Sequence, residues 1–304
     1  MKAILLCLRL LVVLITAAAL AQGAAGAPMT KGPTPIVVQG VGLQTPESIL
    51  YDRRDDVYLV SNINGNPTGV DGNGFISRMA PSGKVLALKW IDGTKQGVTL
   101  NAPKGMAIVG DVLYVTDITA VRMFDRRTGR PRGSIDIPGS TFLNDAAAGR
   151  DGPVYITDSG WKPDFSPSGT DAVYRIDASG KATQIAKGAA LKNPNGVAVL
   201  PDGTLVIVSG GATGEHYTLR PGGQPQNVRK LPAGGLDGVE VLPGAALLVS
   251  SWAASAVYRV ERGGEAKVVV KNVQSPADIG YDSKRQRVLI PLFQANRVVI
   301  QPLK

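Results

Sequence analysis

The sequence predicts an all-β fold, a six-bladed β-propeller, and three observations support this prediction. A short unit recurs six times along the 304 residues, and in each unit a β-branched strand begins 9 to 11 residues after an anchor position. No helical periodicity separates the strands, which is typical of propellers. The five intervals between the first and last anchors average 46 residues, so six blades fill residues 34–304. The anchors are Glu47, Lys104, Asn144, Asn195, Asp237 and Ala277.

Each unit contains an apolar strand after its anchor, a second β-branched strand, and a third strand that ends in a turn signal such as Pro81-Ser82-Gly83. A fourth strand usually follows, but the last unit stops at Lys304 without one. We therefore expect the spare segment 35–38 to pair with the last blade, because closing the ring removes exposed sheet edges. The predicted second strands begin at Val57, Leu113, Val154, Leu205, Leu247 and Val288, and the third segments are 75–79, 121–124, 173–176, 216–219, 257–260 and 297–300.

The N-terminal segment, residues 1–21, is predicted to be a secretory signal peptide. Lys2 and Arg9 accompany an apolar run, and small residues at Ala19 and Ala21 form a cleavage site. A permanent membrane anchor is the alternative, although the apolar run is short for a span. Residues 22–33 are predicted to be a flexible segment before the propeller. We expect a secreted or periplasmic monomer with no membrane span after cleavage.

Composition excludes several kinds of site. The single cysteine, Cys7, lies in the predicted leader, so the mature chain has no disulfide or thiolate chemistry. The net charge is +9, but the basic residues stand in pairs at turns and not in a stripe with aromatic residues, so we expect no nucleic-acid partner. The sole histidine, His216, falls in a third strand away from the axis, which argues against a serine–histidine triad.

Four of the six anchors carry oxygen ligands. The innermost strands of antiparallel blades start at the same face, so we expect the anchors to ring the mouth of the central channel. Two carboxylates and two amide carbonyls form a hard oxygen set that suits Ca²⁺ or another divalent cation. Pairs such as Asn-Gly are also ordinary turn pieces, so the interpretation depends on their equivalent positions. The predicted metal ligands are Glu47, Asn144, Asn195 and Asp237.

The links from the second to the third strand are long in blades one and three, at 63–74 and 160–171. They are predicted to hang over the channel mouth, where long loops are often functional. A plain turn-rich loop and a mobile lid are both compatible with their composition. Trp161 in the second link is a candidate for stacking against a substrate, whereas Trp90 and Trp252 are expected to pack.

The anchor motifs resemble those of a known family. The segments Pro46-Glu47-Ser48, Leu143-Asn144-Asp145, Pro194-Asn195-Gly196 and Leu236-Asp237-Gly238 occur in the order seen in the gluconolactonase/senescence-marker-protein (regucalcin) family, within the superfamily of calcium-dependent propeller hydrolases. The resemblance spans the mature chain at the level of blades. It implies that Glu47, Asn195 and Asp237 bind the ion directly and that Asn144 binds the ion or the substrate.

Two positions depart from that family. Its members often have an Arg two positions before the blade-three Asn, where it holds a sugar acid, but Phe142 stands there in this chain. Lys104 would repel a cation unless its side chain turns away or meets an anionic group of the substrate. Phe142 and Lys104, together with Asn144 and Trp161, are the candidate substrate-binding residues.

These observations favour a secreted, metal-dependent hydrolase of lactones or related esters, similar to gluconolactonase, with a small-molecule substrate and Ca²⁺ as cofactor. In such a mechanism the ion polarises the substrate oxygen and lowers the pKa of water. Asp237 or Asp145 would orient or deprotonate that water. The alternative is a non-catalytic propeller that binds a small ligand or a protein at its channel mouth, since fold does not fix function. Other propeller enzymes, including lyases and dehydrogenases, are also compatible.

Overall fold

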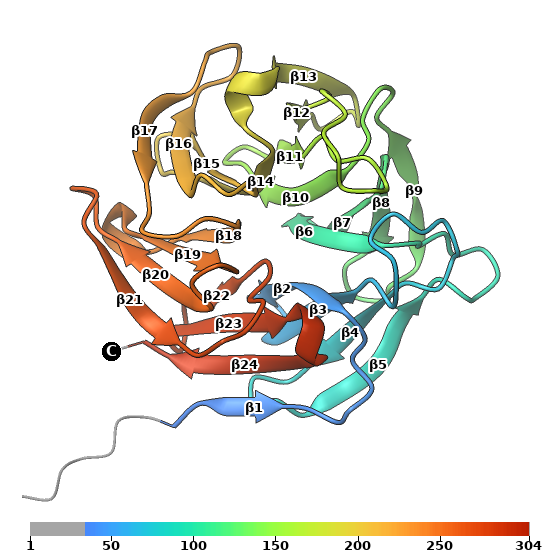
Figure 1. Cartoon of the computed structure of the whole chain (residues 1–304). Coiled ribbons are helices and arrows are strands. Elements are labelled where there is room, and N and C mark those ends of the chain that lie inside the picture. The colour runs from blue at the N-terminus through green and yellow to red at the C-terminus, as the bar shows by residue number, and fades with distance from the viewer. Residues whose placement is uncertain (1–33, 304) are drawn as a thin grey trace, which may run out of the picture. The chain divides into compact units, whose positions relative to one another are not determined.

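The computed structural model describes residues 34–303, which form six four-stranded antiparallel sheets. Figure 1 shows the sheets arranged around a common centre, with the first strand of each blade innermost. The predicted six-bladed β-propeller is therefore confirmed. No helix among the described residues is long and apolar enough to cross a bilayer. The predicted leader at 1–21 and the segment 22–33 lie outside the described residues.

The strand order within each blade follows the chain, apart from the last blade. Blades one to three contain β2 Pro46–Asp52, β3 Val57–Asn62, β4 Phe75–Met79 and β5 Val85–Asp92; β6 Pro103–Val109, β7 Val112–Asp117, β8 Ala120–Asp125 and β9 Pro131–Asp136; β10 Leu143–Ala148, β11 Val154–Asp158, β12 Ala172–Ile176 and β13 Ala182–Lys187. Blades four to six contain β14 Pro194–Val199, β15 Leu205–Ser209, β16 Glu215–Leu219 and β17 Gln226–Lys230; β18 Leu236–Val241, β19 Leu247–Ser251, β20 Ala256–Val260 and β21 Ala266–Lys271; β22 Gly280–Asp282, β23 Arg287–Leu292, β24 Arg297–Pro302 and β1 Ile36–Val38. Three short 3-10 turns lie at η1 Ala189–Leu191, η2 Pro243–Ala245 and η3 Phe293–Ala295.

The ring closes as the sequence predicts. β1 pairs antiparallel with β24 through Ile36–Ile300, Val37–Val299 and Val38–Val298. Figure 1 shows this N-terminal strand on the outside of the last blade. The short β1 therefore covers the edge that β24 would otherwise expose, and the last blade gains the fourth strand that the C-terminal segment lacks.

The hydrophobic core lies between neighbouring blades. The second strands are buried on both sides because each blade packs against the next one, which explains their runs of β-branched and aromatic residues. For example, Leu59 and Ile76 of blade one pack with Val115 and Phe124 of blade two. The fourth strands face outward and are mostly exposed, as in β17.

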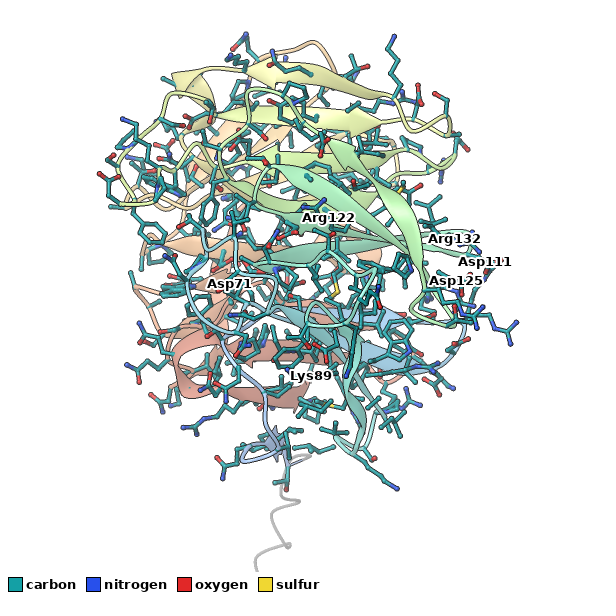
Figure 2. The ribbon with its side chains drawn as sticks, turned by 90° about the vertical axis from the view of Figure 1, so that its right-hand side faces the viewer. Asp71, Lys89, Asp111, Arg122, Asp125 and Arg132 are labelled. Atoms are coloured by element: carbon teal, nitrogen blue, oxygen red, sulfur yellow. The ribbon has the colours of Figure 1, made fainter. Side chains whose placement is uncertain are left out.

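The two faces of the propeller carry different connections. The links between second and third strands lie at one face, and the turns between first and second strands lie at the other. In the side view of Figure 2, Asp71 from the β3–β4 link is at one face, while Asp111 and Asp125 are at the opposite face. The innermost strands start at the face that carries Asp71, so the anchors and the long links share one end of the channel.

Candidate functional site

The anchors lie at irregularities in the innermost strands. The register between first and second strands shifts at five of the six anchors, as between Pro46 and Ser48 in blade one and between Leu236 and Val239 in blade five. β-bulges of this kind redirect side chains and occur often beside active sites. Because the shifts recur in equivalent positions, the anchor side chains of blades one to five point to one cavity at the channel mouth.

Hydroxyl groups on the second strands support these irregularities. Thr157 Oγ1 accepts a hydrogen bond from the Asp145 N–H at 3.0 Å and donates to the carbonyl of Asn195 in the next blade at 2.7 Å. Ser250 Oγ likewise accepts from the Gly238 N–H at 2.8 Å and donates to the Ala277 carbonyl at 2.9 Å. Each hydroxyl therefore fixes the bulge of its own blade and an anchor of the following blade.

Glycines allow the innermost strands to come unusually close. A Cβ atom at Gly196 would lie 2.3 Å from the carbonyl oxygen of Asp237, and one at Gly238 would lie 2.3 Å from the Ile279 nitrogen. Real Cβ atoms do not come this close to backbone atoms, so no larger residue fits without moving the neighbouring strand. The Asn-Gly and Asp-Gly pairs therefore place each anchor beside the next blade.

The cavity at the mouth has a volume of about 450 Å³ and contains all four predicted metal ligands. Its polar part consists of Glu47, Asn144, Asn195 and Asp237, together with Lys104. All five are buried except Asn195, which is half-buried. The structure thus brings together the residues that the repeat places in equivalent positions.

Two carboxylate oxygens in this cavity have no hydrogen-bond partner. Glu47 Oε2 and Asp237 Oδ1 are buried and unpaired, whereas the other oxygen of Asp237 accepts a 2.7 Å hydrogen bond from Trp252 Nε1. Buried polar atoms are rarely left unpaired unless an ion, water or ligand completes them. The amide nitrogens of Asn144 and Asn195 donate to Ser159 Oγ and to the Leu236 carbonyl, so their carbonyl oxygens are the atoms available to a cation.

The electrostatics of the ring favour an added positive charge. Burial raises the pKa of Glu47 well above its usual range, and the charges of Asp237 and Asp278 raise it further. Burial, followed by the charge of Asp278, raises the pKa of Asp237 to about 8. Both carboxylates are therefore costly to ionise in the absence of a cation. A divalent ion would supply the missing charge and the missing partners.

The ammonium group of Lys104 contacts two backbone carbonyls and an aromatic ring. Its Nζ donates to the carbonyls of Pro67 at 2.9 Å and Ala102 at 3.1 Å, and it lies 4.4 Å from the centroid of the Phe142 ring. Burial lowers the pKa of Lys104 to about 8, and the charge of Glu47 opposes this shift. The side chain is held by the β3–β4 link and by Phe142.

Asp145 lies elsewhere. Its carboxylate accepts hydrogen bonds from the Val197 N–H at 2.7 Å and the Ala146 N–H at 2.6 Å, and it lines a second cavity of about 530 Å³ further along the innermost strands. Asp278 and Glu240 line this second cavity as well. The structure does not bring Asp145 together with the four predicted metal ligands.

Aromatic residues of the links complete the mouth cavity. Trp161 lines it, as expected, and so do Phe165 and Phe293, which were not among the predicted residues. Trp252 was expected to pack, but it lines the cavity and donates a hydrogen bond to Asp237. Trp252 follows directly after β19 and therefore lies at the same face as the anchors. Its position at the end of a second strand could have indicated that it lines the cavity. His216 lies apart, in a separate cavity of about 520 Å³ between blades four and five.

The donor set differs from that of metal sites built on acidic or imidazole groups. Within residues 34–303 no three carboxylate, histidine or cysteine side chains converge on one point. The mouth cavity offers two carboxylates and two amides, which is an oxygen set of the kind that Ca²⁺ accepts. The residues present therefore fit a hard divalent cation with several positions left for water or substrate.

The sequence matches one known protein family. The family model of the SMP-30/gluconolactonase/LRE-like region matches residues 46–284. A comparison with curated protein sequences found no match.

Solved structures share the fold at low sequence identity. A gluconolactonase from Xanthomonas campestris is 20% identical, with a TM-score of 0.65 over 86% of this chain and 87% of that one. A putative gluconolactonase is 16% identical, with a TM-score of 0.67 over 90% and 94%. A virginiamycin B lyase from Staphylococcus aureus is also 16% identical, with a TM-score of 0.64 over 89% and 99%. The family match covers five complete blades and part of the sixth, including every anchor, and the chain therefore belongs to the SMP-30/gluconolactonase/LRE-like family.

Proposed function

We propose that this protein is a divalent-metal-dependent hydrolase of lactones or related esters. The observation that carries the proposal is the pair of buried, unpaired oxygens, Glu47 Oε2 and Asp237 Oδ1, in one cavity with two asparagines. Such a pair is unfavourable in an empty structural ring and favourable in a cation site. The gluconolactonases among the similar structures support lactones as the substrate class.

The residues have distinct roles in this proposal. Glu47, Asn195 and Asp237 would hold the ion, and Asn144 would hold either the ion or a substrate oxygen. A bound divalent ion supplies polarisation of the substrate carbonyl and lowers the pKa of water in the cavity. Lys104 has three donors, of which two are used by backbone carbonyls, so one N–H is available to a substrate oxygen.

Asp237 is the favoured group for orienting and deprotonating water. Its Oδ2 is fixed by Trp252 Nε1, while Oδ1 accepts nothing from the described residues. A positioned carboxylate of this kind can act as a general base. Asp145 is held by two backbone N–H groups in the other cavity, so we assign it a positioning role for β14 and not a role in proton transfer.

Calorimetric titration with Ca²⁺, Mg²⁺ and Mn²⁺ tests the site. We expect binding of at least one ion by the unsubstituted protein and no binding by a Glu47→Gln/Asp237→Asn double variant of intact fold. An Asp71→Asn variant is the control, because Asp71 is exposed at the same face and the substitution changes the charge in the same direction.

Activity is then measured with a panel of lactones and esters, with and without chelator. Hydrolysis that the chelator and the double variant both abolish would support the proposal. If no ion binds, the hydrolase proposal fails, and the non-catalytic binding alternative takes its place. The similar lyases make it necessary to identify the product, because hydrolysis adds water to the substrate whereas elimination does not.

Export is a separate proposal. We propose that residues 1–21 direct secretion, since Lys2 and Arg9, the apolar run and the small residues Ala19 and Ala21 form the pattern of a signal peptide. N-terminal sequencing of the protein recovered from culture medium or periplasm would test it. A mature chain that starts at Met1 would contradict it.

A further inference from the structure

The mouth cavity has a wall of apolar side chains around its polar floor. These side chains come from the links of blades one, three, five and six, so they surround the anchors from several sides. Of the described residues that line the cavity, only Glu47, Lys104 and Asp237 carry a charged group. The apolar lining includes Ile63, Phe142, Trp161, Phe165, Trp252 and Phe293, together with Pro67 and Leu236.

Two aromatic pairs stand on different sides of the ring. In blade three, Phe142 and Phe165 meet edge-on, with ring centroids 6.1 Å apart. Trp252 of blade five and Phe293 of blade six have centroids 5.3 Å apart. Such pairs are rigid and present large apolar surfaces. Both pairs line the cavity that contains the anchors.

The backbone of Phe165, which lines the cavity, is strained. Its side chain is 53% exposed, and its backbone has φ of 59°, a left-handed conformation that a bulky residue rarely adopts. A tight turn imposes this conformation, with the Phe165 N–H donating to the Lys162 carbonyl at 2.8 Å and the Lys162 N–H donating to the Ser166 carbonyl at 2.9 Å. Strained backbone and an exposed aromatic ring together indicate a ligand contact more than a packing role.

The cavity offers few partners for a sugar acid. A sugar lactone carries several hydroxyl groups, and each of them needs a hydrogen-bond partner when it is buried. Lys104 directs two of its donors to backbone carbonyls, and the Phe142 ring beside its ammonium group offers no hydrogen bond to a hydroxyl. The polar groups that remain belong to the anchors, which suffice for one carbonyl or ester group.

We infer that the substrate is a lactone or ester that bears an apolar alkyl or aryl group, and that this group lies between the aromatic pairs. The inference rests on the proposed hydrolase function. A volume of about 450 Å³ suits a ligand of this size, since small-molecule sites range over roughly 300–1,000 Å³. The polar end of the ligand meets the anchors, and the apolar end meets Phe165, Trp161 and Trp252.

Binding and turnover are measured separately. Binding of γ-butyrolactone, γ-hexalactone, γ-octalactone and D-glucono-1,5-lactone is followed by tryptophan fluorescence in the presence of chelator, since Trp161 and Trp252 line the cavity. Hydrolysis of the same compounds is followed with Ca²⁺. We expect affinity to rise about fourfold for each added methylene along the γ-lactone series, because each methylene is removed from water. D-Glucono-1,5-lactone should bind more weakly than γ-octalactone.

A matched pair of variants locates the apolar group. Phe165→Ala should weaken γ-octalactone binding about two- to tenfold and leave γ-butyrolactone unchanged, because only the longer ligand reaches the ring. Val70→Ala is the control, since Val70 is 79% exposed on the neighbouring β3–β4 link and does not line the cavity. It should change neither affinity.

The outcomes separate the two proposals. Affinity that does not depend on chain length, or D-glucono-1,5-lactone bound as tightly as γ-octalactone, would overturn the inference even if the sugar lactone is hydrolysed. A rise with chain length that Phe165→Ala reduces would support the inference. If that rise occurs but no compound is hydrolysed, the apolar ligand class stands and the hydrolase function fails.

Discussion

Replacing Asp237 by Asn should stabilise the protein when no metal is present. Asparagine keeps an oxygen that can accept the hydrogen bond from Trp252 Nε1, and it removes the buried carboxylate whose Oδ1 has no partner. The substitution therefore removes a group that is costly to ionise without opening a cavity. A site residue that reduces stability is expected where function and stability compete.

The size of the effect depends on pH. The pKa of Asp237 is about 8 in the folded protein, compared with 3.8 for a free side chain. Since the folded state binds more protons between these values, the stability of the unsubstituted protein falls as pH rises from about 4 to 8. At about 1.4 kcal/mol for each pKa unit, the full loss is at most about 6 kcal/mol. Water in the open cavity reduces this cost, so we expect Asp237→Asn to gain about 2 kcal/mol at pH 9 and about 0 at pH 4.

Urea unfolding in EDTA measures the stability without metal, and unfolding in excess Ca²⁺ measures the stabilisation by the ion. In EDTA at pH 9 the variant should be the more stable protein. Calcium at about 100 times its Kd should stabilise the unsubstituted protein by about 3 kcal/mol and the variant much less. The reasoning would be refuted if Asp237→Asn is destabilised in EDTA, or if calcium stabilises both proteins equally. Asp71→Asn should respond to neither condition, because its side chain is exposed and does not line the cavity, although it lies at the same face as the anchors (Figure 2).

Three further substitutions test a buried ion pair, a close approach of two strands and a buried carboxylate. Arg126→Met should lower the free energy of unfolding by about 3 kcal/mol in urea, because it leaves the buried Asp52 carboxylate, now 2.7 Å from Arg126 Nη1, without its charge partner; a loss below about 1 kcal/mol would contradict this. Gly196→Ala should weaken calcium binding at least about tenfold in calorimetry, since its Cβ would displace the Asp237 backbone; unchanged affinity would show that the close approach is not needed. Glu240→Gln should raise stability by about 1 kcal/mol at pH 9 and leave it unchanged at pH 4, because burial and the charge of Asp278 raise the pKa of Glu240 to about 8; an equal gain at both pH values would rule out this cause.

The repeat made the fold and the anchors predictable. Residues at the same offset in every unit occupy the same place in every blade, so the sequence located Glu47, Asn144, Asn195 and Asp237 without any knowledge of their contacts. The spare segment 35–38 implied the closing strand for the same reason. A repeat shows which residues occupy equivalent positions, and these positions were sufficient to predict the anchors.

Side-chain direction was less predictable. Asn144 and Asp145 are adjacent, yet they line different cavities. The register shift between Leu143 and Ala146 falls at these two residues, and the repeat alone did not indicate which cavity each side chain enters. The place of Lys104 depended on the carbonyl of Pro67 in a distant link. Contacts of this kind depend on the conformation of the loops, which does not repeat from blade to blade.

The hydroxyl links between blades have a consequence for how such a site can be inherited. Thr157 of blade three fixes the anchor of blade four, and Ser250 of blade five fixes that of blade six. The residues that position one anchor therefore come from two repeats. Exchange of a single blade between two propellers would move an anchor away from the hydroxyl of the preceding blade that binds its carbonyl. The ligand geometry is therefore a property of neighbouring blades and not of one blade alone.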